Sequence, residues 1–214
     1  MQKNSFIFHW RNTSLEMLSS RALFLPQTNE LLICDIHLGK GEYFQKNGIP
    51  LPNKADETNL LRIKQIVKKH NPKKLIILGD LFHSKDSISK PLRNKIELLS
   101  ETLNINIELI VGNHDKGCEI KNIKSLKIKK TNNFIFSHEP IIKFDNNILN
   151  ICGHYHPKLY ISNAKDKLSF RCFAMDTKKN ILYLPAFGEL TGGYPCKNDF
   201  KKWAIISDKL ILEI

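Results

Sequence analysis

Short apolar runs of strand length recur along the chain, with turn residues and polar segments between them. Each run is rich in Ile, Leu, Val or Phe, which is the composition of buried strands. We expect strands at LLIC from residue 31, KLIILG from 74, IELIVG from 107, NFIFS from 133, ILNICG from 148, SFRCFA from 169, ILYLPAF from 181 and WAIIS from 203.

Two segments carry apolar residues at helical spacing. The first, residues 56–70, opens with acidic and closes with basic residues, an arrangement that the helix dipole favours. The second spans residues 93–103. Strand and helix therefore alternate in the first half of the chain, as in parallel βαβ units, whereas the second half is mostly strands. The polar stretch 118–133 has only a weak pattern, and we expect exposed strand or loop there.

Length and charge limit the class of protein. The chain has 214 residues without a linker rich in Pro, Gly or Ser, which predicts one domain over residues 1–214. Its formal net charge of +12 would attract a polyanion such as nucleic acid or an acidic membrane surface. The alternative explanation is A/T-rich coding, which enriches Lys, Asn and Ile together without any functional cause.

Cysteine usage and hydropathy indicate the compartment. The five cysteines include no C-x-x-C pair, which fits reduced thiols better than a disulfide framework. The N-terminal residues lack the apolar region of a signal peptide, and no run approaches the roughly 18 apolar residues of a membrane span. We therefore expect a cytoplasmic protein that does not associate with a membrane.

Five successive predicted strands end in residue types that bind metal ions, in the segments DIH, GDLFH, GNHD, SHEP and GHYH. One such segment alone more often marks a turn, but chance does not readily place these residues at every strand end while strand interiors stay apolar. In an open α/β sheet these ends meet in one crevice. Their charges and donors would be unsatisfied there without cations, so we expect two divalent ions. The expected ligands are Asp35, His37, Asp80, Asn113, His138, His154 and His156.

The ligand types also indicate the metal and the reaction. Oxygen ligands mixed with imidazole, and no thiolate, suit Mn best, with Fe or Zn as alternatives. Two such ions about 3.5–4 Å apart can hold both the attacking and the leaving oxygen of a phosphoester.

The same five segments, in this order, resemble the motif series of the calcineurin-like metallophosphoesterases. The resemblance implies an α/β fold, a four-layer sandwich of two mixed β-sheets flanked by helices. It also implies that Asp80 bridges the two ions. The first ion would have the ligands Asp35, His37, Asp80 and His156, and the second Asp80, Asn113, His138 and His154. In that family the histidine of GNHD lies over the scissile phosphate, so His114 becomes the acid for the leaving group and Asp115 the residue that orients it.

A narrower resemblance extends from Arg21 to Gly193, through LLICDIHLGKGEYFQKNGIPLP, HEP, GHYHPKL, RCF and LPAFGELTGG. These landmarks are similar to the PdeM group, bacterial phosphoesterases associated with DNA ligase in the DNA-damage response. The resemblance implies a DNA endonuclease or phosphodiesterase in DNA repair. It also implies a DNA ligase, a helicase and a nuclease as partners.

Two other functions stay open. A small-molecule phosphodiesterase or nucleotide pyrophosphatase would use the same ions. A non-catalytic interaction module would have lost histidines from the site, and the intact set, including His114, argues against it. Asn113 and His114 are the expected substrate contacts. His83 and Lys40 are weaker candidates, because a surface histidine on a turn and a solvated lysine explain them nearly as well or better.

Overall fold

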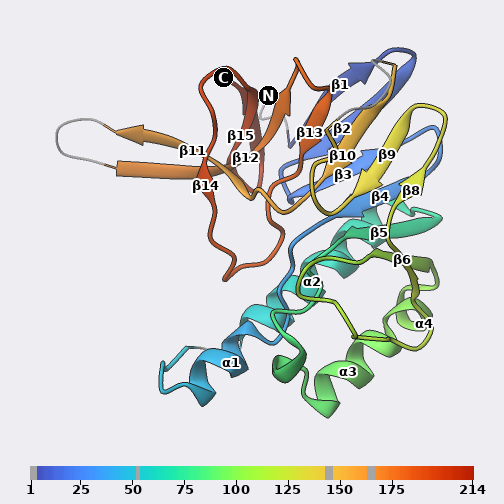
Figure 1. Ribbon diagram of the computed structural model, residues 1–214, viewed down its shortest axis with the longest axis vertical. Helices are drawn as coiled ribbons and strands as arrows, with labels where there is room; N and C mark the ends of the chain where they lie inside the picture. Colours follow the sequence, from blue (N-terminus) through green and yellow to red (C-terminus); the bar gives the residue numbers. More distant parts are fainter. Residues whose placement is uncertain (1–3, 52–53, 143–146, 163–166) are drawn as a thin grey trace.

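Two β-sheets form the body of the protein, with the helices gathered on one side of it (Figure 1). The computed structural model describes residues 4–51, 54–142, 147–162 and 167–214. Strands form at all eight apolar runs predicted from the sequence. The prediction of two mixed sheets in an α/β fold is confirmed, but the described helices pack on the first sheet only, so they supply one of the two helical layers of the expected four-layer sandwich.

The first sheet has seven strands in sequence order, β1-β2-β3-β4-β5-β6-β7. β1 to β4 pair antiparallel, and β4 to β7 pair parallel, as expected for the alternating half of the chain. Their bounds are β1 (Ser5–Trp10), β2 (Thr13–Leu18), β3 (Ala22–Leu25), β4 (Glu30–Ile33), β5 (Lys74–Leu78), β6 (Asn106–Ile110) and β7 (Lys124–Leu126).

The second sheet has nine strands, seven of them in the order β14-β11-β12-β13-β10-β9-β8, with β15 pairing to β12 and β16 to β15. β9 and β10 run parallel, as do β10 and β13. The bounds are β8 (Lys129–Lys130), β9 (Phe134–Ser137), β10 (Leu149–Cys152), β11 (Pro157–Ser162), β12 (Lys167–Asp176), β13 (Ile181–Tyr183), β14 (Tyr194–Pro195), β15 (Lys201–Ser207) and β16 (Leu210–Glu213).

All helices in the described part of the chain fall between residues 40 and 103: α1 (Lys40–Lys46), α2 (Lys54–His70), the 3-10 turn η1 (Lys85–Ser87), α3 (Lys90–Glu97) and α4 (Leu99–Leu103). The predicted helix over 93–103 is therefore two helices separated at Leu98. α3 starts earlier than predicted because the Ser89 hydroxyl accepts a hydrogen bond from the Leu92 N–H. α4 stops at Asn104, whose φ of 52° is left-handed.

Apolar side chains fill the space between the two sheets. Leu32 and Ile76 of the first sheet and Phe136, Phe173 and Trp203 of the second belong to one buried cluster. A second cluster joins the other face of the first sheet to α2, α3 and α4. On the outer face of the second sheet, no helix of the described chain covers the strands. The apolar interface between the two sheets therefore holds them together and sets the position of the strand ends of one sheet relative to those of the other.

Candidate metal centre

The predicted ligands lie where strands of the two sheets end. Loops after β4, β5 and β6 carry those of the first sheet, and loops after β9 and β10 carry those of the second. Hydrogen bonds join these loops within each sheet and between the sheets. The N–H of Asp35 donates to the Gly79 carbonyl at 3.0 Å, and that of Gly153 donates to the His138 carbonyl at 3.1 Å. The N–H of His154, from the second sheet, donates to the carboxylate of Asp35, from the first, at 3.0 Å. The carboxyl ends of parallel strands are thereby assembled into one crevice, as predicted.

Backbone strain is concentrated at these ligands. Five of them have left-handed φ angles, namely Asp35 (53°), His37 (51°), Asp80 (51°), His154 (63°) and His156 (47°). Such a conformation is uncommon for residues other than glycine and costs up to about 1–3 kcal/mol at each position. No feature of the sequence indicates this strain. Its concentration at one crevice is typical of a functional site, where the surrounding structure holds side chains in a required direction.

A first group of ligand atoms surrounds Asp35, whose side chain is fully buried. The Asp35 Oδ1 lies 3.1 Å from the His156 Nε2, yet this nitrogen has no hydrogen-bond partner of acceptable geometry. His37 belongs to the same group of possible ligands. Ligand atoms that share one ion at about 2.1 Å lie roughly 3.0–3.4 Å apart without being bonded to each other. These atoms therefore fit a cation better than they fit one another.

A second group surrounds Asp80 and His138. The Asp80 Oδ2 lies 3.4 Å from the His138 Nε2 and 3.7 Å from the His37 Nε2, so it stands between the two predicted ligand sets. The His138 Nδ1 lies 3.0 Å from the Leu78 carbonyl oxygen, to which it donates, leaving the Nε2 lone pair for a ligand. The His154 Nδ1 is 3.2 Å from this same Nε2. The donor set fits two ions that share the Asp80 carboxylate.

The charges of the crevice shift the pKa of its groups strongly. Burial lowers the pKa of His37 to about 4 against the opposing attraction of Asp80, so the ring is neutral and can act as a ligand. Burial would raise the pKa of Asp80, but hydrogen bonds from His138 and from the His114 N–H outweigh it and bring the value to about 2. Burial would lower the pKa of His138, but the carboxylates of Asp80 and Asp35 outweigh it and raise that pKa to about 9. The carboxylates of Asp35 and Asp80 therefore favour positive charge beside them, which divalent ions would supply.

Asn113, predicted to belong to the second set, is exposed in the structure. Its amide nitrogen donates to the Glu139 Oε1 at 2.9 Å. This hydrogen bond leaves the amide oxygen, the atom that can bind a metal, free to turn toward the crevice. Glu139 is not among the predicted site residues, although it lies in the SHEP segment beside the predicted ligand His138.

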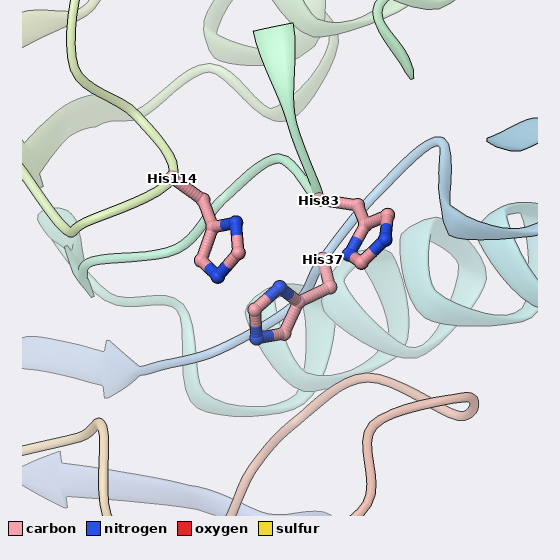
Figure 2. A group of neighbouring side chains, drawn as sticks. All are labelled: His37, His83 and His114. Carbon is pink, nitrogen blue, oxygen red and sulfur yellow. The ribbon is translucent and has the colours of Figure 1, made fainter. Parts of the chain in front are cut away.

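Three imidazoles converge at the mouth of the crevice, those of His37, His83 and His114 (Figure 2). The His114 side chain is 43% exposed, and its Nε2 lies 3.9 Å from the Asp80 Oδ2. Its backbone N–H donates to the Asp80 Oδ1 at 3.0 Å. His83 stacks on His114 with 5.8 Å between ring centroids. From the sequence, His83 could be either a site residue or a surface histidine on a turn. The structure places it next to the predicted acid, His114.

Two aromatic residues that the sequence did not single out also face His83. The rings of Tyr43 and Phe44, both on α1, lie 4.9 Å and 6.0 Å from that of His83. The Lys40 ammonium lies 5.9 Å from the centre of the Phe44 ring, and burial lowers its pKa. Lys40 is thus near the site, and its contact with substrate stays a prediction.

Asp115 supports the loops rather than touching the His114 ring in the contacts described. Its buried carboxylate accepts hydrogen bonds from the N–H groups of Gly112 at 2.9 Å and Phe82 at 3.2 Å. Desolvation raises its pKa against these hydrogen bonds. It therefore ties the loop that carries His114 to the loop that follows Asp80, and its proposed role in orienting the ring stays a prediction.

Two mixed sheets with metal-ligand residues at their joined strand ends define a metal-dependent phosphoesterase, a hydrolase. The sequence model of the calcineurin-like phosphoesterase family matches residues 31–203, so the chain belongs to that family. The structure is similar to the crystal structure of the Pseudomonas putida nuclease MPE, with a TM-score of 0.82 and 25% identity over 99% of this chain and 100% of that one.

A second solved structure is less similar to this chain. YfcE, a phosphoesterase from E. coli, aligns with 13% identity and a TM-score of 0.47 over 86% of this chain and 97% of its own. A search of curated proteins found no match. No helix in the described residues is both long and apolar enough to cross a bilayer.

Proposed function

We propose that this phosphoesterase uses two divalent metal ions to hydrolyse phosphodiester bonds in DNA. The observation that carries the proposal is the position of the Asp80 Oδ2, 3.7 Å from the His37 Nε2 on one side and 3.4 Å from the His138 Nε2 on the other. One carboxylate oxygen between two imidazole sets is the arrangement that a shared ligand of two ions needs. Mn is the expected metal, with Fe or Zn as alternatives.

Bound metal would supply an activated water and neutralise charge on the phosphate. The protein's own residues supply the proton for the leaving oxygen. His114 is suited to this task because its ring is half exposed at the mouth of the crevice while its backbone is anchored to Asp80. His83, stacked against His114, restricts the movement of that ring and lies where a phosphate oxygen could reach it.

Two observations support DNA as the substrate. The net charge of +12 favours a polyanion. A nuclease, the Pseudomonas putida protein MPE, shares the fold over its whole length. A role in DNA repair, with a DNA ligase, a helicase and a nuclease as partners in the cytoplasm, follows from the sequence resemblance and is part of the proposal.

The test is a substrate panel with Mn-loaded protein. Single-stranded DNA, duplex DNA and a small diester, bis-p-nitrophenyl phosphate, are compared at several salt concentrations, with metal content measured on the same samples. We expect two Mn per chain and cleavage of DNA whose binding weakens steeply with salt. Turnover of the small diester without binding or cleavage of either DNA would instead indicate a small-molecule phosphodiesterase. Loss of both activities with two ions bound would indicate a non-catalytic module.

A further inference from the structure

A cluster of basic side chains lies behind the turn Phe187–Thr191, on the opposite side of that turn from Asp35. The turn itself is bound to the metal centre, because the Gly188 N–H donates to the Asp35 carbonyl at 3.2 Å and the Thr191 hydroxyl donates to the same oxygen at 3.2 Å. On its other side, an Nη atom of Arg171 reaches the Gly188 carbonyl at 2.7 Å and the Thr191 carbonyl at 2.9 Å.

Three arginines, Arg21, Arg62 and Arg171, clamp this turn. Among the described residues, the only carboxylate that takes part in the clamp is that of Glu189. Arg21 lies 3.3 Å from the Glu189 Oε1 and donates to the Phe187 carbonyl at 3.0 Å, while Arg62 donates to the same two oxygens. Burial, followed by the repulsion of the other two arginines, lowers the pKa of Arg21 to about 10. The clamp therefore holds more positive charge than its one acidic side chain neutralises.

Lys158 adds a further positive charge that the fold does not need. In the antiparallel pair β11–β12, Lys158 stands directly opposite Arg171. Like charges in this relation destabilise a sheet. Within the described part of the chain, the Lys158 side chain has no hydrogen bond or ion pair, and the Nε of Arg171 is buried without a partner. The Lys158 ammonium therefore has hydrogen-bond donors to spare, whereas the Arg171 guanidinium is held against the turn and contributes its charge.

Lys158 and Arg171 both line a cavity of about 330 Å³. The polar and charged residues that line it are Arg21, Lys158, Arg171, Ser169, Ser207 and Asp208. With Arg62 behind the turn, four cations stand against the two carboxylates Glu189 and Asp208, which leaves two positive charges in excess. An unpaired ammonium group and serine side chains beside excess positive charge are the chemistry that binds a phosphate group.

We propose that Arg21, Lys158 and Arg171 form a second anion site, which holds a phosphate group other than the one at the metal centre. Lys158 follows the predicted ligand His156 by two residues, so their Cα atoms are at most about 7 Å apart. Gly193 lies between them, and a Cβ added there would come within 2.4 Å of the His156 carbonyl oxygen and 2.9 Å of the Lys158 Cγ. The site is thus close enough to bind the flanking backbone of a strand cut at the metals, an assignment that rests on the proposed function.

The test measures binding without catalysis. Fluorescence anisotropy of a labelled single-stranded oligonucleotide is followed in EDTA over a range of salt for the wild type and Lys158→Ala. We expect the variant to bind 5- to 30-fold more weakly and the slope of log K against log salt to fall by about 0.7, the value for one phosphate contact on a single strand. The matched control is Lys64→Ala, which removes the same charge from the exposed face of α2 and should change both quantities less than twofold.

Stability and competition complete the design. Because Lys158 opposes Arg171, Lys158→Ala should unfold at the same temperature as the wild type or higher. A lower unfolding temperature with unchanged DNA binding would show that Lys158 is structural and would overturn the site. Equal effects of Lys158→Ala and Lys64→Ala on the binding of both the oligonucleotide and inorganic phosphate would overturn it too.

Inorganic phosphate identifies the source of the anion. If phosphate displaces the oligonucleotide from the wild type but less from Lys158→Ala, the site binds a backbone phosphate. If Lys158→Ala loses binding of inorganic phosphate but binds DNA normally, the site is real and takes free phosphate instead. Because EDTA removes catalysis from every measurement, a protein that cleaves no phosphodiester would refute the proposed function without deciding the anion site.

Discussion

Replacing Asp80 with asparagine tests the shared ligand with the smallest change of shape. In Asp80→Asn the amide oxygen could still accept the His114 N–H, as the Asp80 Oδ1 does at 3.0 Å. The second oxygen, 3.4 Å from the His138 Nε2, would become an NH₂ group, which donates hydrogen bonds and does not bind metal. The variant therefore removes one negative charge and one ligand atom from both proposed ion sites.

The expected loss can be estimated. Removing a residue that only supports a ligand costs 10- to 100-fold in metal affinity, so loss of a ligand shared by two ions should cost at least about 100-fold, roughly 2.7 kcal/mol. The metal-free fold should survive. The pKa of Asp80 falls from 3.8 to about 2 in the folded protein, which corresponds to roughly 2 kcal/mol of stabilisation for this nearly fully buried carboxylate.

The assay is calorimetric titration of metal-free protein with Mn, together with turnover of bis-p-nitrophenyl phosphate. Asp80→Asn should bind at most one Mn tightly and lose most turnover. Asp176→Asn is the matched control, because Asp176 is a buried carboxylate at the end of β12 whose described contacts are all with the following turn. Two Mn bound at wild-type affinity by Asp80→Asn, with undiminished turnover, would refute the shared-ligand arrangement.

Three further predictions concern His114, Gly79 and Glu108. His114→Ala should keep both ions, since its backbone N–H bond to the carboxylate survives, but slow DNA cleavage roughly 10²- to 10⁴-fold; equal cleavage rates would exclude it as the acid. Gly79→Ala should weaken Mn binding, because its Cβ would lie 2.2 Å from the His138 Nδ1, whereas Gly117→Ala, at a similar φ of 76° but with nothing within 4 Å, should affect only stability. Burial would raise the pKa of Glu108, but two lysine hydrogen bonds outweigh it and lower the pKa, so its stabilisation is present above pH 4.5 and is lost as the pH falls. Glu108→Gln should therefore reduce the unfolding free energy by roughly 1–3 kcal/mol at pH 7 and by less at pH 3, and chemical denaturation that showed the same difference at both pH values would contradict this.

The sequence alone was sufficient for eight of the strands and for the residue types that follow those bearing the predicted ligands. Apolar runs such as KLIILG are short, continuous and bounded by glycine, which leaves little choice but a buried strand. The N-terminal strands β1 to β3 were not predicted, because alternating segments such as TSLEML have a face that only packing against the second sheet reveals as buried.

Only the tertiary structure decided how those residues act together. Sequence spacing says nothing of the left-handed backbone at Asp35 and Asp80, because φ there is imposed by hydrogen bonds between loops distant in the chain. The stacking of His83 on His114, and the meeting of Lys158 with Arg171 over a cavity, likewise depend on contacts between separate strands and loops. Residue chemistry is local and can be read along the chain, whereas the direction and the electrostatic neighbours of a side chain are set by the whole fold.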